Sequence, residues 1–186
     1  MSDAVAVRIL GIAGSLRRGS YNAATLRAAQ ELAPAGMTIE RFDIAPIPLY
    51  NEDVRQQGFP LPVEDFRGRI KSADGLLIVT PEYNYSIPGV LKNAIDWASR
   101  PPDQPFDGKP IGIMGASMGI HGSSRAQYHL RQCFVFLNGL VMNRAEVMIP
   151  VAQNKFDADG MLTDQPTRDF ITAHLAVFKS WVLRLR

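Results

Sequence analysis

Long apolar runs with almost no polar interruption are the feature that most restricts the fold of this chain. ADGLLIVT, residues 73–80, is the clearest, and AVAVRILGIA (4–13) and KPIGIMGAS (109–117) have the same character. A strand with one face in water alternates apolar and polar side chains, whereas a strand covered on both faces is apolar throughout. Hydrophobic residues make up 46% of the 186 positions, which is enough to cover such strands. The runs therefore predict a parallel sheet with helices on both faces.

Segments with helical spacing of apolar residues lie between these runs. In residues 21–33, alanines and a leucine recur at helical spacing, and Pro34 follows them. PGVLKNAIDWAS (88–99) begins with a proline, which the first turn of a helix tolerates. Right-handed crossovers would place such helices on both faces of the sheet. We expect a doubly wound α/β fold, with a five-stranded parallel sheet (4–13, 37–44, 73–80, 109–117 and 145–150) and helices at 21–33, 63–73, 88–99, 124–137 and 164–185, of which 63–73 is short and exposed.

No repeat, low-complexity tract or linker divides the sequence, so we expect one domain spanning residues 1–186. The proline-rich stretch 45–62 is expected to be a long loop without a helix or strand. The net charge is only +2, and the arginines are scattered rather than gathered into the basic stripe of a nucleic-acid-binding protein. No apolar run approaches the ~20 residues of a membrane-spanning helix. Neither nucleic acid nor membrane is therefore an expected partner.

Cys133 is the only cysteine, so no disulfide can form within the chain. That usage is typical of a reducing compartment. Residues 1–20 lack the pattern of a secretory leader. We expect a cytoplasmic protein, with Cys133 as a small core residue in the apolar run CFVFL.

The first apolar run leads into GSLRRGSYN, residues 14–22, which is rich in groups that bind anions. Its glycines are wrongly spaced for the dinucleotide fingerprint G-x-G-x-x-G. The glycine spacing of a P-loop is present, but Ser20 and Tyr21 stand where that motif needs a lysine and a metal-binding hydroxyl. Nucleotide triphosphate hydrolysis is therefore not expected.

A site for a single phosphate fits this segment better. Ser15 and Ser20 supply hydroxyls, Arg17 a charged fork and Asn22 an amide, and a helix that starts near Ser20 adds free N–H groups. The simpler alternative is a capped helix with solvated arginines, because serine is a good N-cap in any protein.

Two more loops are expected at the same edge of the sheet. PEYNYSIPGVLKNAIDW (81–97) places tyrosines, an asparagine and a glutamate after the 73–80 strand, between two prolines. Such a loop suits the wall of a planar heterocycle with polar edges. ASMGIHGSS follows the 109–117 strand, and its Ser117 and Gly119 allow the backbone to approach a ligand closely. Together the three loops indicate a planar ring system that carries one phosphate.

The motifs GSLRRGSYN, PEYNYSIPGVLKNAIDW and GASMGIHGSSRAQYHLRQ resemble those of the NADPH-dependent FMN reductase family, and most closely its bacterial quinone and chromate reductases. The resemblance covers about residues 7–150 and extends to KFDADGMLTD (155–164). It implies a flavodoxin-like three-layer sandwich and an FMN site. The implied FMN-binding residues are Ser15, Arg17, Ser20, Tyr21 and Asn22 in the first loop, Pro81, Glu82, Tyr83, Asn84 and Tyr85 in the second, and Ser117 and Gly119 in the third.

This resemblance further implies an oxidoreductase that takes hydride from NADH or NADPH and passes electrons to a small-molecule acceptor in ping-pong order. Flavin N5 would be the reactive centre, so no side chain is expected to be catalytic, and no metal site is expected. Quinones, free flavin, azo compounds and chromate are all candidate acceptors. The family also implies a homodimer or homotetramer. An FMN electron carrier that does not react with NAD(P)H remains the alternative, and Arg100 and His121 have no assigned role.

Overall fold

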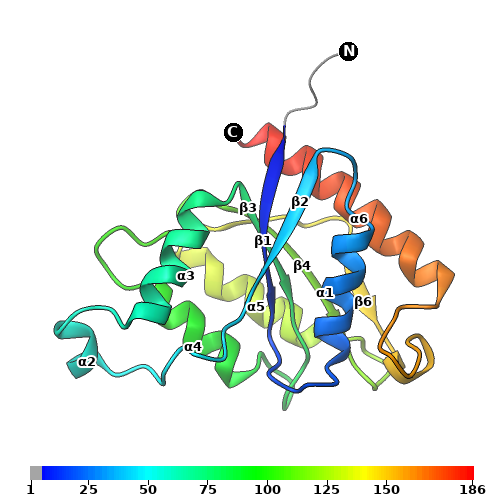
Figure 1. The fold of residues 1–186 in the computed structure, drawn as a ribbon, viewed down its shortest axis with the longest axis horizontal. Coiled ribbons are helices and arrows are strands. Elements are labelled where there is room, and N and C mark those ends of the chain that lie inside the picture. The colour runs from blue at the N-terminus through cyan, green and yellow to red at the C-terminus, as the bar shows by residue number, and fades with distance from the viewer. Residues whose placement is uncertain (1–5) are drawn as a thin grey trace.

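Parallel strands and helices alternate along the chain in the computed structural model, which describes residues 6–186 (Figure 1). The strand order is β2-β1-β3-β4-β5, with β6 also paired to β4, and every pairing is parallel. This is the order of a flavodoxin-like doubly wound sheet, as expected. The strands are β1 (Val7–Ala13), β2 (Met37–Phe42), β3 (Gly75–Val79), β4 (Pro110–Ala116), β5 (Leu140–Val141) and β6 (Val147–Ile149); the helices are α1 (Tyr21–Glu31), α2 (Glu52–Gln56), α3 (Leu61–Ser72), α4 (Gly89–Ala98), α5 (Ser124–Phe136) and α6 (Gln165–Arg184), with a short 3-10 turn at Ala152–Asn154.

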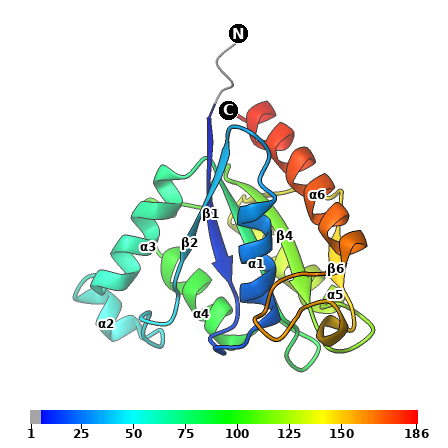
Figure 2. The ribbon, with the colours of Figure 1, turned by 45° about the vertical axis from the view of Figure 1, so that its right-hand side comes forward.

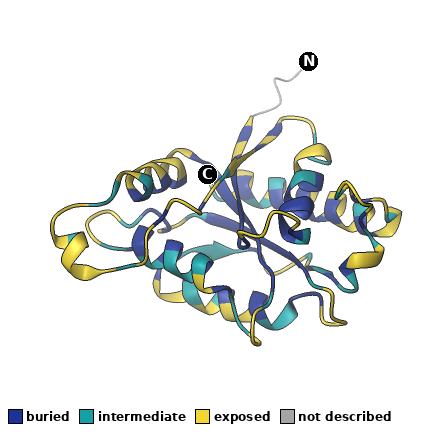
Figure 3. Ribbon diagram, turned by 60° about the horizontal axis from the view of Figure 1, so that its bottom comes forward, coloured by how far each residue is buried: buried dark blue, intermediate teal, exposed yellow. Residues whose placement is uncertain are grey.

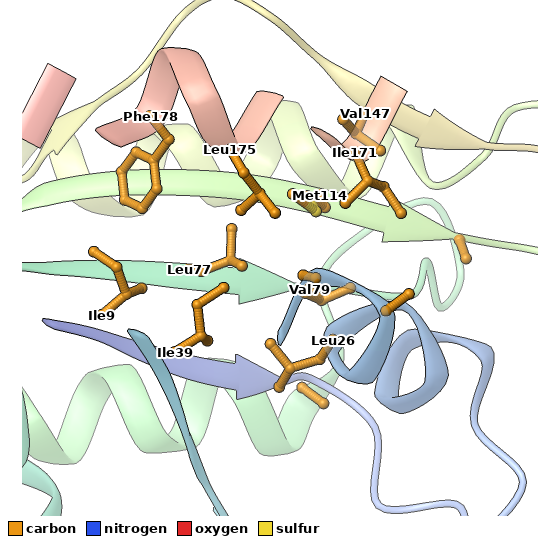
Figure 4. Close-up of a cluster of buried hydrophobic side chains, with 14 of the residues drawn as sticks. Ile9, Leu26, Ile39, Leu77, Val79, Met114, Val147, Ile171, Leu175 and Phe178 are labelled. Atoms are coloured by element: carbon orange, nitrogen blue, oxygen red, sulfur yellow. The ribbon is translucent and has the colours of Figure 1, made fainter. Parts of the chain in front are cut away.

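Two hydrophobic cores, one on each face of the sheet, make this a three-layer structure (Figure 2). Helices α1 and α6 cover one face, where Leu26 of α1 and Leu175 of α6 pack toward Leu77 of β3 (Figure 4). Helices α3, α4 and α5 cover the other, around Phe66, Trp97 and neighbouring strand residues. All five residues of β3 and all seven of β4 are buried, because both of their faces lie under helices. None of the helices in residues 6–186 is long and apolar enough to cross a membrane.

The place of the fifth expected strand is shared by two short ones. β5 pairs with the start of β4, through Pro110 and Leu140, and β6 pairs with its end, through Met114 and Val147. The polar stretch NRAE between them leaves the sheet, so the described sheet has six strands rather than five. The first strand, expected at 4–13, begins at Val7, and residues 4 and 5 lie outside the described residues.

Three other expectations are wrong in detail. The 45–62 stretch contains α2, whose N-cap Asn51 accepts a hydrogen bond from the Asp53 N–H. Helix α3 is not simply exposed, because Val63, Phe66 and Ile70 recur at helical spacing and are fully buried. Cys133 is half-buried instead of fully buried, and desolvation raises the pKa of its thiol.

The parallel sheet brings the functional loops together. Strands β1, β3 and β4 run side by side in register, with Ile12 beside Ile78 and Ile78 beside Ile113. Their carboxyl ends therefore lie at one edge, which comes forward in Figure 3. The segments 14–20, 80–88 and 117–123 all leave the sheet there. The three loops expected to form one site do start from one edge.

A buried histidine lies between α6 and β4. The His174 ring is 1% exposed, and its Nδ1–H donates to the Ala145 carbonyl at 2.6 Å. Its Nε2 has no partner among residues 6–186. That atom would lie 3.2 Å from a Cβ at Gly112, so the glycine leaves room for the ring. Protonation would put a charge in this apolar layer. Desolvation, helped by the Arg131 charge, lowers the His174 pKa from 6.5 to about 4.

We predict that His174 makes the fold sensitive to mild acid. The unfolded chain binds a proton at this ring near pH 6.5, but the folded chain binds it only near pH 4. The free energy of unfolding should therefore fall as the pH drops through this window, by up to ~3 kcal/mol, and level off below it. In His174→Asn, whose amide can keep the bond to Ala145, urea unfolding at several pH values should show a flatter dependence. An unchanged slope in the variant would contradict this assignment.

Candidate functional site

The three loops at the carboxyl edge enclose a cavity of about 320 Å³, within the usual range for small-molecule sites. Nine of the twelve residues that the sequence pointed to line it, whereas Asn84, Tyr85 and Gly119 do not. Ala116 and Met118 also line it and were not expected; their only signal in the sequence was their place at the end of β4. The lining residues are Ser15, Arg17, Ser20, Tyr21, Asn22, Pro81, Glu82, Tyr83, Ala116, Ser117 and Met118.

One end of this cavity is built to receive an anion. Ser20 is the N-cap of α1, and its Oγ accepts a hydrogen bond from the Ala23 N–H at 3.3 Å. The N–H groups of Tyr21 and Asn22 have no acceptor within residues 6–186. Arg17 forms no ion pair with any residue in that range, and its guanidinium lies 5.6 Å from the centre of the Tyr21 ring. A free cation and unpaired helix N–H groups together attract negative charge.

Ser15 connects the first loop to the second. Its Oγ lies 3.3 Å from the Tyr83 hydroxyl and accepts the Arg17 N–H at 3.4 Å. The Ser15 side chain is buried, whereas Tyr83 is half exposed. The two hydroxyls thus place a polar group and an aromatic ring at one wall of the cavity.

The side-chain amide of Asn22, expected from the sequence to face a ligand, is bonded to the protein through its oxygen and one of its hydrogens. Its Nδ2–H donates to the Ala116 carbonyl at 2.9 Å, and its Oδ1 accepts the Ala116 N–H at 2.9 Å. The side chain is buried and links the first turn of α1 to the end of β4. Asn22 therefore holds two walls of the cavity together, while its backbone N–H and the second hydrogen of its amide have no acceptor within residues 6–186.

Glu82 is likewise engaged by the protein. Its buried carboxylate accepts the backbone N–H groups of Arg125 and Ala126 at the start of α5, at 3.1 and 3.3 Å, and pairs with the Arg125 guanidinium. The hydrogen bond that the Arg125 guanidinium donates to Glu82 raises the Arg125 pKa. The pairing neutralises the Glu82 charge, so the carboxylate does not cancel the attraction of Arg17 for an anion. The role of Glu82 is to fix the second loop to α5.

Asn84 and Tyr85 form the tip of a two-residue turn outside the cavity. Tyr83 and Ser86 exchange both backbone hydrogen bonds at 3.0 Å, and the two residues between them have φ of +49° and +66°. Positive φ at both central positions is typical of a type I′ turn, and asparagine adopts it readily. Tyr85 is 66% exposed, and the Arg125 guanidinium lies 3.6 Å from the centre of its ring. Asn84 and Tyr85 therefore belong to the rim of the cavity and not to its floor.

The third loop supplies the opposite wall. Ser117 is held by its backbone, which donates to the Ile149 carbonyl and accepts the Ala152 N–H, both at 3.0 Å. Its hydroxyl donates to the Gly119 carbonyl at 3.2 Å. A Cβ at Gly119 would meet only the Ser117 Oγ, at 3.9 Å. The protein itself therefore does not require glycine there, because the space beside it is open.

Arg100 and His121 do not line this cavity. The Arg100 guanidinium donates to the Asp96 carbonyl and to the Ser99 Oγ, and it lies over the Tyr50 ring. His121 is an exposed residue of the third loop, and its carbonyl accepts the Ser124 N–H. Arg100 thus stabilises the end of α4, and His121 stays without a role in the site.

The donors and walls suit a ligand of the FMN type. Hydroxyls, an unpaired arginine and free helix N–H groups gather at one end, where a monophosphate would be held. Pro81, Tyr83 and Met118 supply apolar surface farther along the cavity, where a planar ring would lie. Among the lining residues, Glu82 is the only one with a negative charge, and Arg125 neutralises it.

Comparison with known proteins independently supports a site for FMN. Residues 7–154 match the model of the NADPH-dependent FMN reductase family. The chain is 60% identical to an NAD(P)H-dependent FMN reductase of Pseudomonas aeruginosa over the full length of both chains. It is 50% identical to a quinone reductase of Escherichia coli strain K12, over 97% of each chain. Among solved structures, it is similar to the flavoenzyme NAD(P)H:(acceptor) oxidoreductase FerB of Paracoccus denitrificans, with a TM-score of 0.87, 34% identity, and coverage of 96% of this chain and 98% of that one.

We predict that Asn22→Ala lowers stability more than Gln30→Ala, another loss of a side-chain hydrogen bond from α1. Asn22→Ala leaves the buried N–H and carbonyl of Ala116 without partners, which should cost ~2–4 kcal/mol of unfolding free energy. Gln30→Ala is the matched control, because it removes one half-buried bond from the same helix to Ile39 and should cost ~1 kcal/mol. Urea unfolding of both variants without added cofactor measures the difference. Equal losses would argue against the bridging role of Asn22.

Proposed function

The chain belongs to the NADPH-dependent FMN reductase family, and on that premise we propose that it is an oxidoreductase that uses FMN to pass electrons from NADH or NADPH to quinones. The observation that carries this proposal is the anion-binding end of the cavity. There the unpaired Arg17, the hydroxyls of Ser15 and Ser20 and the start of α1 come together at the carboxyl edge of the sheet.

Each part of the cavity has a distinct task under this proposal. Arg17, Ser15, Ser20 and the free N–H groups at the start of α1 bind the FMN phosphate. Asn22 and Glu82 keep the loops in place through their bonds to Ala116 and to the start of α5.

The remaining wall residues bind and shield the ring. Pro81, Tyr83 and Met118 offer it apolar surface and exclude water, and Gly119 leaves room for it beside the third loop. When bound, FMN supplies the redox chemistry by accepting hydride from the nucleotide and returning it to the acceptor. No side chain needs to act as a nucleophile or as an acid, so the residues contribute through orientation and shielding.

The reductase is favoured over an electron carrier of the flavodoxin kind. The relatives described above are named as FMN, quinone and acceptor reductases. The rim of the cavity is also open: Tyr83 is 50% exposed and Met118 is 59% exposed. A second substrate therefore has access to the same cavity. Quinones are the acceptor class that we propose, with free flavin, azo compounds and chromate as further acceptors of an open site.

We also propose that residues 1–186 act as one domain in a cytoplasmic homodimer or homotetramer. Helix α5 supports association, because Val135 is 80% exposed and Phe136 is 94% exposed on it. The lone Cys133 is compatible with a reducing compartment. Sedimentation of the holoprotein should give a multiple of the 20.5 kDa chain mass, whereas a monomer at micromolar concentration would contradict the assembly.

The proposal predicts that Arg17→Ala weakens FMN binding about 10- to 100-fold, because one charge-assisted contact to a phosphate is lost. Arg18→Ala is the matched control, since Arg18 is an exposed neighbour that does not line the cavity. Its FMN dissociation constant should change by less than ~3-fold. Quenching of flavin fluorescence on addition of apoprotein measures both constants. If both variants bind FMN as the unaltered protein does, Arg17 does not bind the phosphate.

A second prediction tests the reaction itself. The purified protein should be yellow, and its visible absorption should bleach when NADH or NADPH is added without oxygen and return when a benzoquinone is added. A flavin that stays oxidised with both nucleotides would identify an electron carrier. A protein that binds no FMN even after reconstitution would contradict the assignment of the cavity.

A further inference from the structure

A second hollow lies on a different part of the molecule, between α6 and the segment that joins β5 to β6. Its volume is about 390 Å³, and none of its residues lines the cavity at the carboxyl edge. β5 pairs with Pro110 and Ile111 at the start of β4, so the hollow lies beside the opposite end of the sheet. Nothing in the proposed reductase function uses it.

The floor of this hollow is apolar. Met142 is buried, Val177 is 46% exposed, and Trp181 is partly buried against the core. The Trp181 Nε1–H donates to the Leu140 carbonyl at 3.3 Å, so the polar atom of the indole is already engaged by the backbone. The Ser180 hydroxyl donates to the Ala176 carbonyl. What remains for a ligand is an aromatic and aliphatic surface.

Two arginines border that surface. Arg144 and Arg184 are exposed, and their side chains form no ion pair or hydrogen bond with any residue from 6 to 186. No acidic residue lines the hollow. Behind it, Arg131 donates to the Met142 carbonyl at 3.0 Å and to the Asn143 Oδ1 at 3.3 Å, and its only acidic neighbour in the described chain, Glu146, is 3.9 Å away. The local charge is therefore positive.

An apolar floor and two unpaired guanidinium groups recognise different parts of one ligand. A planar ring gains from contact with an indole and aliphatic side chains. A carboxylate matches the donor fork of arginine. A simple inorganic anion would leave the floor uncovered, and a neutral aromatic compound would leave both cations without a partner. We propose that this hollow binds a small aromatic carboxylate at a site separate from the cofactor cavity.

Calorimetric titration of the FMN-loaded protein with 2-naphthoate tests the proposal. The unaltered protein should bind one equivalent per chain at that site, and Arg144→Gln combined with Arg184→Gln should weaken binding by at least ~10-fold. Arg41→Gln is the control, because Arg41 is exposed and does not line the hollow, and it should bind 2-naphthoate as the unaltered protein does. The neutral amide of 2-naphthoate should bind at least ~10-fold more weakly than the acid.

Three results would overturn the proposal. One is equal binding by the double variant and the unaltered protein, accompanied by a change in flavin absorption, which would place 2-naphthoate at the cofactor cavity. Another is the absence of binding at millimolar concentration. The third combines two observations: the unaltered protein does not bind 2-naphthoate, and the double variant has a lower assembled mass in sedimentation. That result would assign both arginines to a protein interface.

Discussion

The parallel alignment of β1, β3 and β4 is the constraint on which the rest of the structure depends. Because these strands run in one direction and in register, their carboxyl ends meet at one edge, and three loops far apart in sequence start there. Helices cover both faces of β3 and β4, and these strands contain only apolar residues. The two strands therefore supply no polar side chain for binding or catalysis. All binding groups are therefore confined to the loops.

Several polar residues near the cavity serve the loops more than they serve a ligand. Asn22 links α1 to β4, and Glu82 links the second loop to α5. Asn22 satisfies the N–H and the carbonyl of Ala116, and Glu82 satisfies two backbone N–H groups at the start of α5. Since these two side chains are occupied, Arg17 and the start of α1 are left as the strongest attraction for an anion. The site is thus positively charged because Asn22 and Glu82 are bonded to the protein, whereas Arg17 has no acidic partner among the described residues.

The sequence predicted the parts of the structure that depend on local pattern. The continuous run 73–80 identified β3, and the serine-rich segment after β1 correctly indicated the N-cap Ser20. The pairings of Asn22 and Glu82 were missed, because both depend on atoms about 94 and 43 positions away. The split of the last strand was missed for a similar reason: whether NRAE stays in the sheet depends on the packing of β4 and α6, which periodicity does not report.

The bonds between Asn22 and Ala116 also have a consequence for how a ligand enters and leaves the cavity. A helix start held by a neighbouring strand keeps its shape when the cavity contains only water, so little conformational entropy is lost when a ligand enters. A chain of this kind can release its cofactor and take up another without local unfolding. The contacts that the cavity makes with each bound molecule, rather than unfolding of the chain, would then set how long that molecule stays.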